Sequence, residues 1–348
     1  MNGKKMNIVI DFVFIFIVLL IIIVSSLLLK DEKKDTAESY DFQILEKDME
    51  VSALYTDDEW VYVGTNNGIH IYDADTLELL YEIDNISMVY TASIVGDGEN
   101  GVWVGHESGL THIDREWNQI NFEYPKIPKG RVNVVAIKDE NVYCGTYHGA
   151  AVITKKDGTW SVARILTKEE GLLCDSVNVI LPVEDGILYG SYMDTNGGIT
   201  FISDSGQISY LDVSSGLPHP YITSAFKESN GNILLGTGYM RDGALVELAK
   251  NENCYTIENI YSTKDGLPGE KIRYIFEDEF SVWITTEYDG VLIKPKLGDE
   301  NWIENREIYL TQESGLSDNE IKCIVRAKDY YWLGGKYGLT IVPKTILE

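Results

Sequence analysis

The side chains that most often carry out chemistry in proteins are spread thinly along this sequence. Its five histidines, His70, His106, His112, His148 and His219, include no pair at helical spacing, and its four cysteines form no Cys-x-x-Cys. These patterns predict no metal site and no redox motif. The sequence also lacks a Gly-x-Ser-x-Gly motif and a Walker-type phosphate-binding loop. We therefore assign no catalytic residue and expect no cofactor.

Paired carboxylates are the one catalytic arrangement that the composition leaves open. The chain has 55 acidic residues, so two of them will lie ~5–9 Å apart by chance, which is the separation that glycosidases use. Asp194, Glu287 and Asp289 would be the first candidates if the protein acted on a polysaccharide.

The charge of the chain excludes one class of partner. The 348 residues carry 29 basic and 55 acidic side chains, which gives a formal net charge of −26. Such a surface repels nucleic-acid phosphates, so we expect neither DNA nor RNA as a partner. Hydrophobic residues make up 44% of the chain, which excludes global disorder. Four cysteines are too few for a disulfide-built scaffold.

Residues 8–29 are almost wholly apolar, with Asp11 as their only charge. As a helix at ~1.5 Å per residue they reach ~33 Å, enough to cross a hydrocarbon core of ~30 Å. A cleaved signal peptide usually has a shorter apolar core, of ~7–15 residues. The pattern favours an uncleaved signal anchor at 8–29, with a cytoplasmic N-terminus at 1–7 and a polar stalk at 30–40.

The orientation of this span follows from chain length and not from charge. Two lysines and the α-amine precede the span and three lysines follow it, so the positive-inside count is about tied. A very short N-terminus before a large domain favours an N-terminus inside the cell. We therefore expect a single-pass protein of the cell membrane with its main domain on the extracytoplasmic side.

The rest of the chain is a sevenfold repeat. An apolar-Gly-Thr type tripeptide recurs with its middle residue at positions 64, 105, 145, 190, 236, 285 and 334, at intervals of 41, 40, 45, 46, 49 and 49. A four-stranded propeller blade has ~40–50 residues. Each unit also contains short runs rich in Val, Ile, Tyr and Trp between Gly, Asn and Asp, which is typical of strands. The fold class predicted for 41–348 is an all-β, seven-bladed β-propeller, which follows an N-terminal transmembrane helix.

Two details of the repeat carry structural predictions. The glycine after an apolar strand lets neighbouring backbones approach closely where blades taper, although Thr285 replaces it in the sixth unit. The seventh unit ends after its third strand at Glu348. We expect residues 42–45 to supply its outer strand and so close the ring without an exposed edge.

Four of the units open with a stronger signature, which reads Gly171-Leu172, Gly216-Leu217-Pro218, Gly266-Leu267-Pro268 and Gly315-Leu316-Ser317. Together with Val102-Trp103-Val104-Gly105 and Gly109-Leu110, this pattern resembles the two-component regulator propeller repeat family. The resemblance covers 41–348, and the first three units match it less well because they lack the opening Gly-Leu.

Propellers of that family are usually the extracytoplasmic sensor portions of membrane receptors, often for carbohydrates. Those receptors continue into a second β-domain, a membrane span and a kinase or cyclase. The resemblance therefore implies binding of a ligand or protein, and not signalling by this polypeptide alone. A separate signalling protein is one further partner that it implies.

The loops between second and third strands open on one face of a propeller and are the candidate binding site. In units three to seven each of these loops carries a tyrosine, namely Tyr147, Tyr192, Tyr239, Tyr288 and Tyr337. Polar neighbours accompany them, namely His148, Asp194, Arg241, Asp289 and Lys336. Flat rings with hydroxyl tips suit sugars and peptides. Because the chain has 22 tyrosines, packing of each ring within its own loop is the alternative explanation.

The sequence thus predicts a non-catalytic, sensor-like propeller that is anchored in the membrane and faces outward. Its partner would be a carbohydrate, a peptide or an envelope protein bound on the loop face. One alternative is a protein-interaction scaffold in an envelope complex. The other is a propeller hydrolase or lyase that acts on a polysaccharide.

Overall fold

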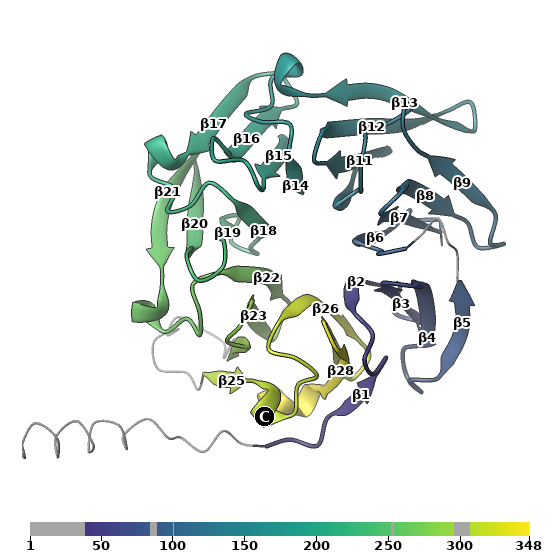
Figure 1. Cartoon of the computed structure of the whole chain (residues 1–348), viewed down its shortest axis with the longest axis vertical. Helices are drawn as coiled ribbons and strands as arrows, with labels where there is room; N and C mark the ends of the chain where they lie inside the picture. Colours follow the sequence, from purple (N-terminus) through teal and green to yellow (C-terminus); the bar gives the residue numbers. More distant parts are fainter. Residues whose placement is uncertain (1–38, 84–88, 100, 252–253, 296–306) are drawn as a thin grey trace, which may run out of the picture. The chain divides into compact units, whose positions relative to one another are not determined.

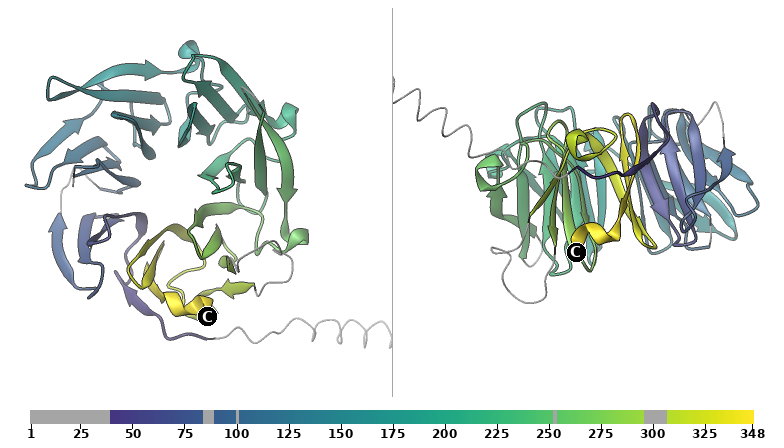
Figure 2. Two further views of the ribbon diagram at one scale, coloured as in Figure 1. Left: turned by 180° about the vertical axis from the view of Figure 1, so that it is seen from behind. Right: turned by 90° about the horizontal axis from the view of Figure 1, so that it is seen from below.

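The computed structural model describes residues 39–83, 89–99, 101–251, 254–295 and 307–348. Asp41–Glu348 form one compact unit in which seven four-stranded antiparallel sheets follow one another around a ring (Figures 1 and 2). This confirms the predicted all-β, seven-bladed propeller. The predicted span at 8–29 lies outside the described residues, as does most of the predicted stalk. Within the described ranges, no helix is both long enough and apolar enough to cross a membrane.

The strands of each sheet follow in chain order from the channel outward, except in the last sheet. The seven sheets are β2 (Val51–Thr56), β3 (Trp60–Thr65), β4 (Gly68–Asp73) and β5 (Leu79–Ile83); β6 (Ser93–Gly96), β7 (Val102–His106), β8 (Gly109–Ile113) and β9 (Gln119–Phe122); β10 (Val134–Lys138), β11 (Asn141–Thr146), β12 (Gly149–Lys156) and β13 (Thr159–Leu166); β14 (Val177–Val183), β15 (Gly186–Ser191), β16 (Gly198–Ser203) and β17 (Ile208–Asp212); β18 (Ile222–Lys227), β19 (Ile233–Thr237), β20 (Leu245–Asn251) and β21 (Cys254–Tyr261); β22 (Ile272–Glu277), β23 (Ser281–Thr286), β24 (Val291–Pro295) and β25 (Ile308–Leu310); and β26 (Ile321–Ala327), β27 (Tyr330–Gly335), β28 (Gly338–Pro343) and β1 (Gln43–Leu45).

The core lies between neighbouring sheets. The hydrophobic cluster that contains Leu188 and Phe201 of the fourth sheet also contains Leu235 and Leu248 of the fifth. Other clusters join the first sheet to the second, the second to the third and the seventh to the first. Clusters also join the third sheet to the fourth and the fifth to the sixth, and Trp283 of the sixth sheet packs against Tyr331 of the seventh. Each sheet therefore buries both of its faces against other sheets, which explains why the second strands read as unbroken apolar runs.

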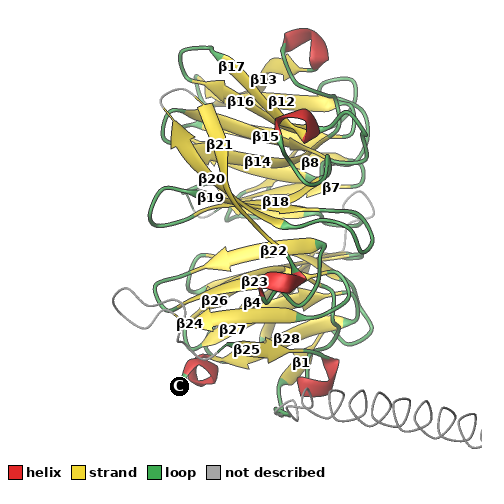
Figure 3. Ribbon diagram, turned by 90° about the vertical axis from the view of Figure 1, so that its left-hand side faces the viewer, coloured by secondary structure: helices red, strands yellow, loops and turns green. Residues whose placement is uncertain are grey.

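The Gly-Leu signature of the later units closes a short helix. The helices η2 (Lys168–Glu170), η3 (Val213–Ser215), η4 (Thr263–Asp265) and η5 (Gln312–Ser314) precede the inner strands of sheets four to seven, and η6 (Lys344–Leu347) follows β28. Figure 3 shows these helices in red among the loops. The glycine after η4, Gly266, has φ 95°, and the leucine that follows it, Leu267, is buried. The motif thus supplies a left-handed C-cap and an apolar anchor for the next blade.

The repeated glycine of the second strands makes room for the next blade. A Cβ on Gly190 would lie 2.8 Å from Cγ2 of Ile222, on the inner strand of the following sheet, and a Cβ on Gly145 would lie 2.6 Å from Cγ1 of Val177. A side chain at these positions would therefore push adjacent blades apart. The glycine is thus required by the close approach of adjacent blades, as the sequence predicts from the tapering of the blades.

Strand β1 lies at the outer edge of the seventh sheet. It pairs antiparallel with β28, with Gln43 opposite Ile341 and Leu45 opposite Leu339. Two segments more than 290 residues apart in the chain thus share one sheet (Figure 1). This confirms that the predicted segment 42–45 supplies the outer strand of the seventh blade.

The residue after β1 ties this strand to the first blade. Glu46 lies 2.6 Å from Nδ1 of His70, and it also accepts a hydrogen bond from the hydroxyl of Tyr72, both on β4. Burial opposes ionisation of Glu46, but the hydrogen bonds from His70 and Tyr72 and the charge of His70 outweigh it and lower the pKa of this carboxyl. The ionised side chain therefore holds the segment that completes the ring.

Replacing this carboxylate weakens the closure. We expect Glu46→Gln to lower the free energy of unfolding by about 1–3 kcal/mol near neutral pH, because it removes charge-assisted hydrogen bonds in a buried site. A carboxyl whose pKa is lowered by folding stabilises the protein above its unfolded pKa and loses that effect as the pH falls through its folded pKa. The difference between variant and wild type should therefore shrink below about pH 4.

Urea unfolding followed by circular dichroism, from about pH 7 to about pH 3, measures this difference. Glu116→Gln, at an exposed position in the turn before β9, is the matched control and should behave as wild type. Equal stability of Glu46→Gln and wild type at neutral pH would contradict the role given to Glu46.

Candidate functional site

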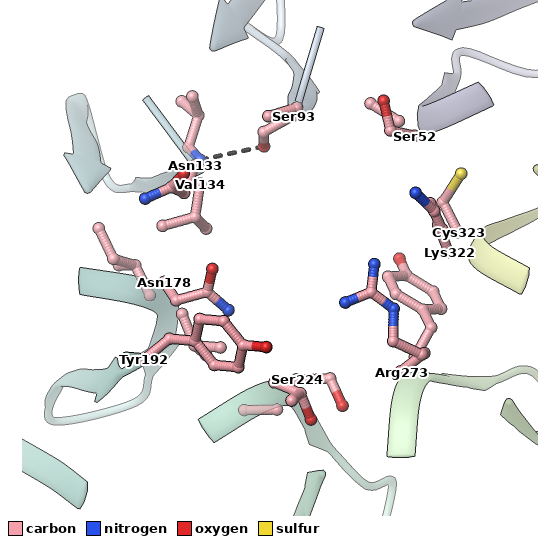
Figure 4. Close-up of a pocket in the computed structure, with 18 of the residues that line it drawn as sticks. Ser52, Ser93, Asn133, Val134, Asn178, Tyr192, Ser224, Arg273, Lys322 and Cys323 are labelled. Atoms are coloured by element: carbon pink, nitrogen blue, oxygen red, sulfur yellow. Dashed lines mark hydrogen bonds between the residues drawn. The ribbon is translucent and has the colours of Figure 1, made fainter. Parts of the chain in front are cut away.

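A cavity of about 420 Å³ lies at the mouth of the central channel. Residues near the start of the inner strand of all seven sheets line it, from Ser52 in the first to Lys322 in the seventh (Figure 4). Tyr147 and Tyr192, from loops between second and third strands, also line it, as do Tyr90 and Arg131 from loops between blades. The cavity therefore opens on the face that carries both sets of loops, which is the face that the sequence analysis selects.

One position of the inner strands carries a repeated hydrogen bond between blades. This position comes directly after the first apolar residue of the strand, as Asn178 comes after Val177. Its side chain donates a hydrogen bond to a main-chain carbonyl of the next blade. The bonds are Ser52 to Thr91 (2.7 Å), Asn133 to Val177 (3.4 Å), Asn178 to Ile222 (3.2 Å) and Thr223 to Ile272 (2.5 Å). A polar residue at this position thus fixes one blade to the next along the rim of the cavity.

The sixth and seventh blades carry cations at this position, Arg273 and Lys322. In the sixth blade the bond to the next blade comes from a different residue, because the hydroxyl of Thr285 donates to the carbonyl of Ile321 over 2.7 Å. Thr285 is the residue that stands where the other second strands have glycine. Its hydroxyl takes over the scaffolding bond, and the guanidinium of Arg273 extends toward the cavity instead (Figure 4).

The described residues that line the cavity include three cations, Arg131, Arg273 and Lys322, and no carboxylate. Two acids outside the lining hold two of these cations. Oε1 of Glu320 lies 3.1 Å from Nη2 of Arg273 and 3.6 Å from Nζ of Lys322, and Oε1 of Glu50 lies 2.6 Å from the same Nζ. The wall of the cavity is therefore basic, although the chain as a whole is strongly acidic.

Electrostatic contacts keep Lys322 and Glu50 charged. Burial opposes the charge of Lys322, but Tyr90, Glu320 and Glu50 outweigh it and raise the pKa of the ammonium. Burial likewise opposes ionisation of Glu50, while the hydrogen bond and charge of Lys322 lower the pKa of that carboxyl. A ligand that enters the cavity meets Lys322 as a cation at neutral pH.

Two of the five predicted loop tyrosines line this cavity. The hydroxyl of Tyr147 accepts a hydrogen bond from Nη2 of Arg131 at 3.0 Å, and Arg131 also stacks over the ring of Tyr90 at 4.6 Å. The hydroxyl of Tyr192 accepts from Nζ of Lys271 at 3.3 Å. Tyr192 is shown at the cavity wall in Figure 4.

Three other predicted residues line a second, smaller hollow of about 120 Å³, namely Arg241, Tyr288 and Asp289. There the guanidinium of Arg241 lies 4.9 Å from the ring centre of Tyr288 and 3.4 Å from Oδ1 of Asp289. Tyr239 packs edge-on against Tyr221, with the ring centres 5.7 Å apart.

The remaining predicted residues line neither of these hollows. Nδ1 of His148 lies 3.0 Å from the carbonyl of Lys129, and the carboxylate of Asp194 accepts from the main-chain nitrogen of Asn196. Tyr337 is half exposed, with Nζ of Lys336 5.3 Å from its ring centre. Ligand contact by any of the ten residues stays a prediction, but their positions divide them between two hollows and the loop surface.

Sequence reasoning missed the cations of the main cavity. Arg273 and Lys322 occupy the variable position inside the repeated pattern Ile-x-x-Ile of the inner strands, at Ile272–Ile275 and Ile321–Ile324. When the repeats are compared, the residue at that position is polar in most units and cationic in two of them. This difference is the signal that could have identified Arg273 and Lys322.

The contacts of Glu287 do not suit the general acid of a glycosidase. Glu287 forms a buried ion pair with Lys271, whose side chain is 4% exposed. Burial opposes ionisation of Glu287, but the hydrogen bonds from Lys271 and Tyr288 and the charges of Lys271 and Arg273 lower the pKa of its carboxyl. A glycosidase acid needs a raised pKa. Among the residues that the structure describes, no three metal-ligating side chains come together.

No family model matches the sequence, and no curated protein matches it. Solved structures do match. The extracellular domain of a protein described as the hybrid two-component system BT3049 of B. thetaiotaomicron has a TM-score of 0.71 and 19% identity, over 86% of this chain and 39% of that chain. The extracellular domain of a one-component system of the same organism, BT4673, has a TM-score of 0.67 and 16% identity, over 87% and 40%.

A third match comes from another organism. PorZ of Porphyromonas gingivalis, a surface component of the type-IX secretion system, has a TM-score of 0.62 and 13% identity, over 89% of this chain and 47% of that chain. This chain thus spans less than half the length of each of the three proteins. At these identities the matches show the fold, and they agree with the resemblance to two-component propellers that the repeats indicate.

The buried ion pair of Lys271 and Glu287 lines the second hollow and allows a test of the electrostatics there. We expect Lys271→Met to lower the free energy of unfolding by about 3 kcal/mol, because it leaves the carboxylate of Glu287 buried without its cation. The double variant Lys271→Met/Glu287→Gln should recover most of that loss. Urea unfolding near neutral pH measures both variants, and an equal loss in the single and double variants would show that Glu287 does not depend on Lys271.

Proposed function

We propose that the protein is a membrane-anchored, extracytoplasmic sensor-like propeller that binds its ligand in the cavity at the channel mouth. The observation that carries this proposal is the convergence of three cations, four tyrosines and two amides on one cavity of about 420 Å³, on the loop face. Small-molecule sites commonly have volumes of ~300–1,000 Å³, an apolar lining and a few convergent polar groups.

The composition of the wall supports a small polar ligand, such as a glycan or a peptide. Apolar side chains, among them Val135, Ile180 and Phe226, line the inner strands behind the polar rim. Tyrosine rings give flat apolar area with a polar tip, and amides give paired donors and acceptors. The likeness to extracellular domains of two-component and one-component systems supports a sensor role on the outer side of the membrane.

Binding is tested with the full chain in detergent against panels of glycans and peptides by thermal shift. A ligand at about a hundredfold excess over its Kd stabilises the protein by about 2.7 kcal/mol. We expect a saturable shift with at least one ligand, and we expect Tyr192→Ala to weaken its affinity about tenfold by removing a ring from the cavity wall.

Tyr337→Ala separates the cavity from the loop surface. Tyr337 lies on the loop surface outside the cavity, so a ligand held in the cavity should lose little affinity in this variant. Equal losses of ligand affinity in Tyr192→Ala and Tyr337→Ala would instead show that the binding site extends over the whole set of loops. No shift with any glycan or peptide would count against the sensor.

Anchoring is tested separately, by deleting residues 8–29. The apolar length of this segment supports a membrane span. We expect the full chain to sediment with the membranes of expressing cells, with its propeller open to protease added outside, and the deletion variant to leave the membrane fraction. Membrane association of the deletion variant would contradict the anchor.

A scaffold role in an envelope complex is the second candidate, and the fold match to PorZ, a component of a secretion system, favours it. If the protein is a scaffold, defined envelope proteins should co-purify with the full chain from solubilised membranes. Substitution of Arg273 or Lys322 should leave this co-purification unchanged.

A further inference from the structure

The wall of the channel-mouth cavity departs from the charge of the rest of the protein. Acidic residues occupy 55 of the 348 positions, almost twice the 29 basic ones. The 26 described residues that line the cavity nevertheless include three cations and no acid. This cavity, which residues from the inner strands of all seven sheets line, is therefore basic, and its charge is opposite to that of the chain.

The counter-ions of these cations stand behind them, outside the cavity lining. Glu50 and Glu320 contact Lys322, and Glu320 contacts Arg273, but neither acid belongs to the lining. This arrangement holds the cationic side chains in place and presents their charge to the cavity. Arg131 is held by Asn133 and Tyr147, which are neutral, so its charge has no carboxylate partner among the described residues.

The spacing of two cations fits a single anion. One oxygen atom, Oε1 of Glu320, lies within 3.1 Å of Nη2 of Arg273 and 3.6 Å of Nζ of Lys322. The two cations are thus close enough for one carboxylate to contact both, and Glu320 already does so from behind. A ligand carboxylate on the cavity side would have the same two partners.

Arg273 also has donor capacity to spare. A guanidinium has five N–H donors, and Glu320 is the ion-pair partner of Nη2. Nε is buried and has no hydrogen-bond acceptor in the described structure. A buried donor without an acceptor is uncommon in folded proteins, and a small movement of the guanidinium toward an anion in the cavity would give this donor an acceptor. The guanidinium faces Tyr192 and Asn178 across the cavity in Figure 4.

From these observations we propose that the ligand of the cavity is a small carboxylate, bound by Arg273 and Lys322, with Tyr192 and Asn178 contacting the rest of the molecule. This inference rests on the proposed ligand-binding function and specifies its chemistry. A sugar acid and an acidic amino acid share this chemistry, and both match the size of the cavity. Paired charge-assisted hydrogen bonds from a guanidinium make a carboxylate a better ligand than its neutral analogue.

The test uses matched pairs of probes that differ in one carboxylate, namely glucuronate with glucose, galacturonate with galactose, and glutamate with glutamine. Each is titrated against the full chain in detergent by calorimetry, at low and at physiological salt. We expect at least one acid to bind about tenfold or more tightly than its neutral partner, and to lose affinity as salt screens the charges. The pair that responds identifies a sugar acid or an amino acid as the source of the carboxylate.

Variants assign the binding to the two cations. Arg273→Gln should weaken the acid about tenfold or more and leave its neutral partner little changed. The double variant Lys322→Gln/Glu50→Gln removes the second cation together with its counter-ion, so that no carboxylate is left buried alone, and should also weaken the acid. Lys264→Gln, in η4 between blades five and six and outside both hollows, is the matched control and should bind as wild type. Circular dichroism confirms that each variant is folded.

The outcomes separate this inference from the function on which it rests. If a neutral sugar, glutamine or another uncharged ligand binds and the acids do not, the carboxylate inference fails and the sensor function stands. If an acid binds equally well to wild type, Arg273→Gln and the double variant, the assignment to this cavity fails. If neither the matched pairs nor the wider glycan and peptide panels bind, both the inference and the proposed function fail.

Discussion

The structure depends on one repeated contact, between the inner strand of a blade and the second strand of the blade before it. At Gly145 and Gly190 the missing side chain lets Val177 and Ile222 of the next blade approach to a distance that no Cβ would allow. Seven contacts between these strands, six at a glycine and one at Thr285, must be satisfied at once for the ring to close, because each sheet covers its neighbours. Closure also requires β1 to lie beside β28, so the two ends of the described ring stabilise each other.

The same contact explains how a binding site can be built without disturbing the fold. Most blades use a short polar side chain at the channel rim to hold the next blade, as Asn178 does with Ile222. In the sixth blade Thr285 makes the equivalent bond from the neighbouring strand. The rim position is thereby released from its scaffolding role, and Arg273 occupies it. A departure from the repeat at one place in the sequence thus accompanies a functional residue at another.

The fold could be predicted from the sequence, because the ring imposes a regular spacing of glycines and apolar strands that is visible without a structure. The tyrosines could be predicted only in part. Tyr147 and Tyr192 reach the channel mouth, whereas Tyr288 lies at a separate hollow and Tyr337 on the loop surface. Loop length explains this difference only partly, since Tyr147 and Tyr337 both lie in two-residue loops. Tyr147 is held by Arg131 and Tyr192 by Lys271, through hydrogen bonds to residues 16 and 79 positions away in the chain, and such contacts are not visible in the repeat.

Arg273 and Lys322 could not be identified from the sequence for a related reason. In a strand, alternate side chains point to opposite faces, so Arg273 after Ile272 looks like an ordinary solvent-facing residue. In a propeller both faces of the inner strand lie against neighbouring blades beside the channel and not in bulk solvent, so a charge there must be held by a partner. Glu50 and Glu320 are those partners. A chain with a net charge of −26 repels anions over longer distances, and salt limits this repulsion to ~8 Å. Attraction of an anion must therefore come from contacts inside the cavity, where close range and partial exclusion of water strengthen the effect of Arg273 and Lys322. This combination selects for anions small enough to enter the channel mouth and against extended polyanions that would also meet the acidic surface.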